Sequence, residues 1–471
     1  MTEKPLKRKR GKVILFILLG IVTLTAGFFL ISGYVKTLPA ITWEYYTGDA
    51  EPAPYPDVRF AVLSDLHYYD TSLGTEGAAF LEVFHSDRKL LLESRELLER
   101  AISEIEGASG LTAAGDGETG NSGSGPQFVL VSGDLTKDGE RTNHEQVASR
   151  LQQLVGQGVQ VFVVPGNHDV NNPGAVRYVG DSTEPVDTVS ADEFAEIYAN
   201  MGYGGALLRD GDSLSYVAEP VPGLWIVGLD SCRYRENQPG QEEIFSGKIS
   251  QETERWLAGV LAQALDGGKA VMVLTHHGVV EHWQGQAKLH PAYLIQDYRY
   301  MGRMLASWNV RLVFTGHYHA QDIVYGEFAR GSLYDVETGS LVTPSCPVRF
   351  CSLTDNVLTV ETMTLIDRLR PGTDYAERAT AFARENVISE AYGTLRSYKV
   401  SETNARYIAE AVGDGFMAHY SGDEDPAAKP PFDESRLNLW GRIIFFLQKY
   451  IVDGIRVDLP PGDNNVTLPL R

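Results

Sequence analysis

One pattern recurs five times along the chain: a short apolar run ends in a cluster of Asp, Asn or His. These runs with their clusters read RFAVL-SDLH, QFVLV-SGDL, VFVVP-GNHD, AVMVL-THHG and VRLVF-TGHYH. A short, largely β-branched apolar run is typical of a strand that is buried on both faces. Sites in α/β proteins form outside the carboxyl ends of such strands. The pattern therefore predicts that five strand ends converge on one polar site.

Helical stretches alternate with the apolar runs, which is the signature of the α/β class. Two further apolar runs in residues 214–229 flank a turn at 220–223 and predict a hairpin. A low-complexity stretch at 107–125 predicts a flexible surface insertion. The predicted helices of this α/β part are 80–105, 144–155 and 251–264.

The alternation of helical and strand-like stretches ends after residue 367. Beyond it, helical stretches follow one another without strand-like runs between them. A Pro- and charge-rich break at 423–431 divides this region. We expect a catalytic domain over 58–366 and a small C-terminal helical domain over 367–471. The predicted helices of the latter are 375–395, 403–420 and 435–454.

The N-terminal segment has the composition of a membrane anchor. Residues 4–12 read KPLKRKRGK, and residues 13–35 contain no charged side chain. About twenty apolar residues cross a bilayer, and a preceding basic cluster stays in the cytoplasm. We expect a cytoplasmic tail and transmembrane helix over 1–36, a linker over 37–57 and an extracytoplasmic catalytic domain on a single-pass cell-membrane protein. A cleaved signal peptide is the alternative.

Charge and cysteine content exclude some classes of protein. The formal net charge is −21, and no basic stripe follows the first dozen residues, so no nucleic-acid binding is expected. A small anionic substrate stays compatible because bound metal ions reverse the local sign of charge. The chain has three cysteines and no CxxC pair, which argues against a thiolate zinc site. Cys346 and Cys351 are either free thiols or, outside the cell, a disulfide.

Six of the eleven histidines fall in the strand-end clusters, together with Asp65, Asp134 and Asn167. Buried carboxylates and several imidazoles at one place require compensation, which metal ions supply. Oxygen and imidazole donors without thiolate suit Mn, Fe, Zn or Co. Seven ligands exceed one tetrahedral ion and fit two divalent ions that share a carboxylate. The candidate ligands are Asp65, His67, Asp134, Asn167, His276, His317 and His319.

The ordered motifs resemble those of the calcineurin-like metallophosphoesterase superfamily. They are Asp65-Leu66-His67, Gly133-Asp134, Gly166-Asn167-His168-Asp169, His276 and Gly316-His317-Tyr318-His319, and the resemblance covers residues 58–363. It implies a four-layer α/β/β/α sandwich. It also implies a metal-dependent hydrolase that cleaves phosphoester bonds with a bridging hydroxide on a dinuclear centre.

The resemblance also implies a role for each residue. Asp65, His67, Asp134 and His319 would hold the first metal ion. Asp134, Asn167, His276 and His317 would hold the second, so that Asp134 bridges the two ions. His168 would be the catalytic imidazole beside the leaving oxygen, and Asp169 would orient it. His277 is an alternative to His276, because Gly278 stands where the family usually has proline.

A narrower resemblance connects the stretch SGDLTKDGERTNHE, the anchor and the helical tail to bacterial class III cyclic nucleotide phosphodiesterases. It favours a phosphodiesterase acting on a cyclic nucleotide. The alternatives are a lipid or cell-wall phosphoesterase, a phosphomonoesterase, or a membrane-tethered binding protein with a degenerate site. The oligomeric state stays open.

Six further polar or aromatic residues lie near these motifs. Asn143 and His144, within the same stretch, are expected to cap a helix. Four others either line the substrate cleft or pack behind the ligands: Tyr68, His277, His282 and Tyr318.

Overall fold

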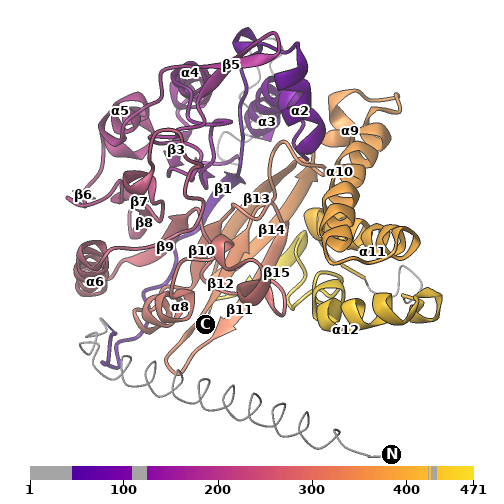
Figure 1. The fold of residues 1–471 in the computed structure, drawn as a ribbon. Coiled ribbons are helices and arrows are strands. Elements are labelled where there is room, and N and C mark those ends of the chain that lie inside the picture. The colour runs from indigo at the N-terminus through magenta and orange to yellow at the C-terminus, as the bar shows by residue number, and fades with distance from the viewer. Residues whose placement is uncertain (1–44, 109–124, 423, 426–431, 471) are drawn as a thin grey trace, which may run out of the picture. The chain divides into compact units, whose positions relative to one another are not determined.

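The computed structural model describes residues 45–108, 125–422, 424–425 and 432–470, and two β-sheets form the centre of this part (Figure 1). The order of the first sheet is β15-β14-β13-β1-β2-β3, with β1 (Val58–Leu63), β2 (Phe128–Val131), β3 (Gln160–Val163), β13 (Pro347–Thr354), β14 (Val357–Thr364) and β15 (Asn465–Pro469). β1, β2 and β3 are parallel to one another. The pairs β1–β13, β13–β14 and β14–β15 are antiparallel.

The second sheet has seven strands in the order β11-β12-β10-β9-β8-β7-β6. They are β6 (Leu208–Arg209), β7 (Tyr216–Val221), β8 (Leu224–Leu229), β9 (Ala270–Thr275), β10 (Leu312–Thr315), β11 (Asp322–Glu327) and β12 (Ser332–Glu337). Strands β8, β9, β10 and β12 are parallel. The expected hairpin at 214–229 is confirmed as β7 and β8. A separate hairpin consists of β4 (Val176–Val179) and β5 (Ser182–Pro185).

Alternation of side chains along the strands explains why the two sheets pack together. Met272 and Phe314 belong to the core cluster that also contains the first sheet, whereas Val273 and Val313 belong to the cluster under the outer helices. Successive residues of a strand point to opposite faces, so each strand serves both cores. The ring of Phe60 on β1 meets that of Phe314 edge-on at 5.4 Å between the sheets.

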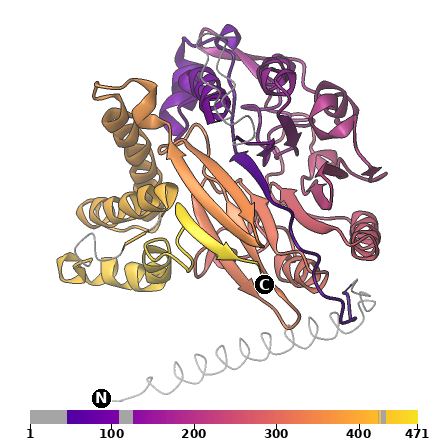
Figure 2. The ribbon, with the colours of Figure 1, turned by 180° about the vertical axis from the view of Figure 1, so that it is seen from behind.

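Helices cover the outer faces and complete a layered α/β sandwich (Figures 1 and 2). α3 and α4 contribute leucines to the core of the first sheet, and α6 and α8 pack on the second. The α-helices are α2 (Ala78–Ser86), α3 (Ser94–Ala108), α4 (Arg141–Gly156), α5 (Ala191–Ile197), α6 (Gln251–Asp266), α7 (Gln286–Leu289), α8 (Tyr298–Ser307), α9 (Ile366–Leu369), α10 (Tyr375–Ser397), α11 (Glu402–Ser421) and α12 (Leu439–Gly454).

The single helix predicted over 80–105 is wrong, because the chain leaves helical geometry between α2 and α3. The carboxylate of Asp87 accepts hydrogen bonds from the backbone amides of Arg88 and Lys89, and the Leu90 amide donates to the Val342 carbonyl at 2.7 Å. These contacts outside the helix compete with its next turn. The non-helical segment between α2 and α3 places Arg88 and Lys89 at the edge of the polar site.

The small C-terminal helical domain predicted over 367–471 is neither separate from the sandwich nor entirely helical. Residues 465–469 form β15, which pairs with β14 at the edge of the first sheet. The sequence NVTLP offers β-branched residues to an edge that would otherwise expose unpaired backbone groups. Tyr375 and Ala379 of α10 belong to the main core, and Figure 2 shows the C-terminal helices beside the first sheet. The helices therefore extend the catalytic domain.

Three predictions concern segments at the margins of the structure. The expected membrane segment at 13–35 and most of the 107–125 insertion lie outside the described residues. Among the helices that the structure does describe, none combines the length and apolar character needed to cross a membrane. In the expected linker, Tyr55 is buried and donates a hydrogen bond to the Val271 carbonyl at 2.7 Å. The three cysteines are free thiols.

Candidate metal centre

The carboxyl ends of β1, β2, β3, β9 and β10 meet at one place, and all seven predicted metal ligands gather there. Asp65 and His67 follow β1, and Asp134 follows β2. The remaining four follow strands of both sheets, so the centre lies across the sandwich: Asn167, His276, His317 and His319.

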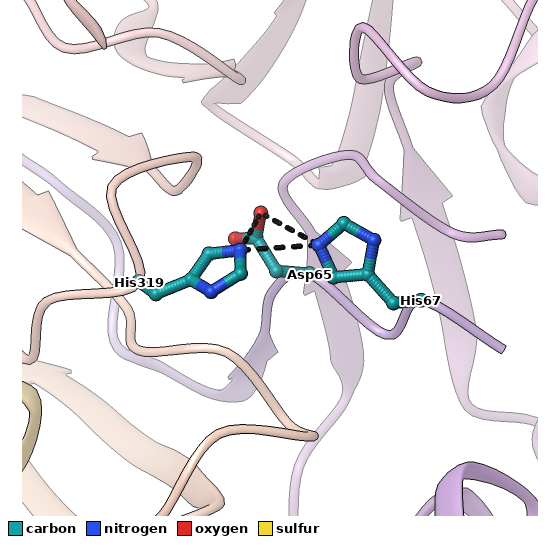
Figure 3. Close-up of side chains that lie close together, drawn as sticks. All are labelled: Asp65, His67 and His319. Atoms are coloured by element: carbon teal, nitrogen blue, oxygen red, sulfur yellow. Dashed lines mark hydrogen bonds and ion pairs between the residues drawn. The ribbon is translucent and has the colours of Figure 1, made fainter. Parts of the chain in front are cut away.

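Asp65, His67 and His319 form the first half of the centre (Figure 3). The Nε2 atoms of the two histidines face each other at 3.1 Å, and Asp65 Oδ1 lies 3.4 Å from His319 Nε2 and 3.9 Å from His67 Nε2. Two imidazole nitrogens and a carboxylate oxygen that converge in this way form a nitrogen and oxygen donor set for a divalent cation.

Asp134, His276 and His317 form the second half, and Asn167 adjoins them. His276 Nε2 lies 3.4 Å from Asp134 Oδ2 and 3.1 Å from Asn167 Oδ1. The opposite nitrogen, Nδ1, donates to the Ser132 carbonyl at 2.7 Å. This hydrogen bond fixes the tautomer that leaves Nε2 with a free lone pair, as in metal-bound histidines generally.

Asp134 connects the two halves. Its Oδ2 atom lies 3.4 Å from His276 Nε2 in one half and 3.6 Å from His67 Nε2 in the other. The residue is 1% exposed. A buried carboxylate between two sets of imidazoles has the position of a ligand shared by two cations.

Polar atoms without partners test whether these residues fit metal ions. Within the described residues, His317 Nε2, Asn167 Nδ2 and His67 Nδ1 are buried and have no hydrogen-bond partner. A buried polar atom left unpaired costs roughly 1–3 kcal/mol. A cation beside His317 Nε2 would satisfy that atom and compensate the buried carboxylates, so the residues present fit two divalent ions.

The protonation of the centre follows from burial and from Asp134. Burial lowers the pKa of His67 and of His317, which leaves both rings neutral. Burial alone would raise the pKa of Asp134, but the neighbouring His276 and His168 hold it well below its usual range. Burial likewise opposes the charging of His276, and the carboxylate of Asp134 raises its pKa to about 9. His67 and His317 are therefore neutral and Asp134 is ionised, which are the forms that bind metals, and a metal ion would displace the proton from His276.

His277 has no free nitrogen to offer a metal. Its Nε2 donates to the Phe245 carbonyl at 3.0 Å, and its Nδ1 accepts from the Ser231 hydroxyl at 2.7 Å. His276, in contrast, directs Nε2 at Asp134 and Asn167. The geometry therefore favours His276 over His277.

Five of the candidate ligands have left-handed backbone geometry, which side chains other than glycine rarely adopt. The φ angles are 49° for Asp65, 36° for His67, 49° for Asp134, 75° for His317 and 64° for His319. Left-handed geometry costs roughly 1–2 kcal/mol per residue. Strain of this kind gathers at functional sites, where the surrounding packing holds it.

The glycines of the motifs permit the close approach of neighbouring ligands. A Cβ atom on Gly133, whose φ is 94°, would lie 2.6 Å from His276 Nδ1. A Cβ atom on Gly316 would lie 2.5 Å from Asp65 Oδ2 and 2.0 Å from Ser64 Oγ. Any larger residue at these positions would displace a ligand.

His168 borders the centre, but its partner is not the one expected. The ring Nδ1 donates to Asp138 Oδ1 at 3.1 Å, and Nε2 lies 3.9 Å from Asp134 Oδ2. Asp169, predicted to orient His168, instead accepts from the backbone amides of Leu135, Thr136 and Gly166. The role given to Asp169 is therefore corrected: it holds the loops after β2 and β3 together, and Asp138 holds the imidazole.

A cleft of about 400 Å³ opens on the centre. Asp134, Asn167, His168, His317 and His319 line it. Its other walls come from five parts of the chain, mostly with charged and aromatic side chains: Val83, Asp87, Arg88, Lys89, Glu243, Phe245, Tyr293, Tyr318 and Tyr420.

Other expected residues divide between the cleft and the interior. Tyr318 lines the cleft, whereas Tyr68 is buried with the guanidinium of Arg150 5.0 Å from its ring centroid. His282 is buried elsewhere, with Nε2 3.5 Å from carboxylates of both Asp335 and Glu337. Tyr68 and His282 therefore pack in the interior and do not line the cleft.

The capping role predicted for Asn143 and His144 is wrong, because both lie inside α4. The carboxamide of Asn143 accepts from the Asp70 amide at 2.9 Å. His144 Nε2 donates to the Asp169 carbonyl at 2.8 Å, and Nδ1 accepts from the Tyr198 hydroxyl at 3.0 Å. These side chains hold loops near the centre.

Sequence reasoning missed Asp138, Arg88 and Glu243. Asp138 stands four residues after Asp134 in the stretch SGDLTKDGE, so an acid at fixed spacing from a ligand was the available signal. Arg88 and Glu243 come from loops and left no signal of this kind, because binding groups on loops follow no periodic pattern.

Comparisons with known proteins agree with this geometry. The family model described as calcineurin-like phosphoesterase matches residues 58–321, more than half of the chain. No curated protein sequence matches significantly.

Similar solved structures include a dimetal phosphatase from Danio rerio (16% identity, 67% of this chain and 97% of that chain covered, TM-score 0.44). A phosphopantetheinyl hydrolase from Mycobacterium tuberculosis is also similar (13% identity, 62% and 90% covered, TM-score 0.28). With the family model matched over most of the sandwich, the chain belongs to the calcineurin-like phosphoesterases, enzymes that hydrolyse phosphoesters with a dinuclear divalent metal centre.

Proposed function

We propose that the protein is a phosphodiesterase in which the seven gathered residues hold two divalent ions, with Mn, Fe, Zn and Co as candidates. Asp65, His67 and His319 would bind one ion, Asn167, His276 and His317 the other, and Asp134 both. When bound, such ions supply an activated water at neutral pH and neutralise charge on phosphate oxygens.

The observation that carries the catalytic proposal is the arrangement of His168. Its Nδ1 is held by Asp138, and the ring lines the cleft that contains the candidate ligands. Burial opposes protonation of this ring, whereas its hydrogen bond to Asp138 favours the protonated form. We assign to His168 the transfer of a proton to the leaving oxygen, a step that typically contributes ~10²–10⁴-fold.

The charges of the cleft support a diester over a monoester. Arg88 pairs with Glu390 at 2.5 Å and Lys89 with Asp87 at 3.7 Å, so both cations are partly neutralised. Glu243 adds a carboxylate 3.9 Å from His168 Nδ1. A phosphodiester carries one negative charge where a monoester carries about two, and complementary charge decides which substrate enters.

Substrate screening with the full-length chain and Mn²⁺ tests this function. We expect hydrolysis of bis-4-nitrophenyl phosphate to exceed that of 4-nitrophenyl phosphate. Preference for the monoester would overturn the diesterase proposal. Cyclic nucleotides belong in the same screen, because residues 132–145 resemble those of class III cyclic nucleotide phosphodiesterases.

We also propose that residues 13–35 anchor the enzyme in the cell membrane with the catalytic domain outside the cytoplasm. The described α12 supports a location beside a bilayer, since it exposes Leu439 (78%) and Phe446 (75%), with Trp440 and Leu447 also exposed. Protease treatment of intact spheroplasts is the test. Digestion of the catalytic domain is expected, and its protection until lysis would contradict the orientation.

A further inference from the structure

A second cavity, of about 370 Å³, adjoins the metal cleft. Apolar side chains from α10, α11 and α12 form most of its wall: Leu395, Ile408, Val412, Phe416, Ile444 and Phe445. Ligand pockets of proteins are concave, lined mostly by apolar and aromatic side chains, and about 300–1,000 Å³ in volume. An apolar space of this size between helices is therefore a place for an apolar ligand.

The two cavities are adjacent and share part of their walls. Arg88, Phe245, Tyr293 and Tyr318 line both of them. The ring of Tyr293 lies 4.7 Å from that of His317, a candidate metal ligand, and 4.7 Å from that of Tyr318. An aromatic surface therefore connects the metal centre to the apolar space.

Arg88 stands at the junction between the polar and the apolar cavity. Its guanidinium donates to the Tyr420 hydroxyl at 2.8 Å and to Glu390 at 2.5 Å, and it lies 5.8 Å from the ring centroid of Phe416. A cation fixed beside an aromatic wall suits a ligand whose anionic group and apolar group are adjacent.

We propose that the apolar cavity binds the alkyl or acyl portion of an amphiphilic phosphoester whose phosphate lies at the metal centre. This inference rests on the proposed phosphodiesterase activity and specifies its substrate class. Polar diesters, including cyclic nucleotides, would leave the cavity unused. The C-terminal helices thus form the part of the enzyme that selects the substrate.

A series of alkyl 4-nitrophenyl phosphates tests the proposal with the full-length enzyme and Mn²⁺. In each ester water adds its oxygen to phosphorus, the bond to 4-nitrophenolate breaks, and the alkyl ester remains. From methyl to butyl to octyl, below micelle-forming concentrations, kcat/KM is expected to rise about fourfold per buried methylene until the cavity is filled. A flat series would overturn the proposal.

Calorimetry separates this inference from the proposed activity. If no ester is hydrolysed, the phosphodiesterase proposal fails, and the binding of octylphosphonate against methylphosphonate still tests the cavity. Tighter binding of octylphosphonate supports the apolar site. Equal affinity for the two phosphonates contradicts it.

A matched pair of variants on α10 locates the effect. Ala391 lines the cavity, whereas Ser389 is exposed and does not. Ala391→Phe is expected to reduce the octyl-to-methyl ratio of kcat/KM at least tenfold, and Ser389→Phe to preserve it. An unchanged ratio in a folded Ala391→Phe enzyme would place the alkyl chain elsewhere and overturn the proposal.

Discussion

Asp138 Oδ1 lies 3.1 Å from His168 Nδ1 and fixes the orientation of an imidazole that lines the cleft beside the candidate metal ligands without being one of them. The carboxylate also pairs with Lys137. Burial would raise the pKa of Asp138, but Lys137 and His168 hold it far below its usual range. An ionised acceptor behind the imidazole stabilises its protonated form and leaves Nε2 available to the substrate.

Replacement of Asp138 by Asn is expected to lower kcat about 10–100-fold with little change in KM or in metal content, because the ring loses its charged acceptor. Steady-state kinetics across pH and metal analysis provide the measurements. The matched control is Glu243→Gln, which removes a carboxylate that lies 3.9 Å from His168 Nδ1, beyond hydrogen-bond distance. Loss of metal from Asp138→Asn would show that the residue acts on the centre and not on His168.

The adjacent histidines after β9 are expected to behave differently. His276→Gln removes a candidate ligand and should lower the bound metal from two ions toward one, with loss of activity. His277→Gln breaks hydrogen bonds to Ser231 and Phe245 and should mainly lower stability, by about 1–3 kcal/mol. Elemental analysis and thermal unfolding distinguish the two variants. The reverse pattern would make His277 the ligand.

Gly316→Ala tests the close packing around Asp65. The added Cβ would lie 2.5 Å from Asp65 Oδ2, so the carboxylate must move and metal affinity should fall at least tenfold. Titration of metal-free protein with Mn²⁺ measures the change. Gly259→Ala is the control, since its Cβ meets open space in α6 and should stabilise the helix by about 1 kcal/mol. Unchanged affinity in Gly316→Ala would contradict the predicted crowding.

His144 is expected to make stability depend on pH. Burial lowers its pKa from 6.5 to about 4, so the folded state binds this proton less readily than the unfolded state. The stabilisation is complete above pH 6.5 and is lost as the pH falls toward 4, by at most about 3 kcal/mol.

Urea unfolding at pH 7.5 and pH 5 measures this loss. His144→Gln should show a smaller decrease between the two pH values than the wild type, whatever its stability at pH 7.5. His85→Gln, at an exposed position, should retain the wild-type decrease. Equal decreases in the wild type and His144→Gln would show that His144 does not cause the loss of stability between the two pH values.

The α/β class, the strands that carry the site and the family are determined by the sequence itself. A buried parallel strand is visible in the sequence as a short apolar run. The residues that follow the run must therefore lie at the carboxyl end of the strand. Asp65, Asp134, His276 and His317 can therefore be assigned to one site from the sequence. The matched family model confirms the family.

The tertiary structure alone decided which side chains meet behind and beside that site. Asp138 replaced Asp169 as the partner of His168, the nitrogens of His277 proved to be engaged, and β15 returned from the helical tail to the first sheet. Such contacts join residues far apart in the chain or depend on the direction of a side chain in a loop, and neither has a period that a sequence displays. The apolar cavity is of the same kind, because it exists only where three helices and the cleft come together.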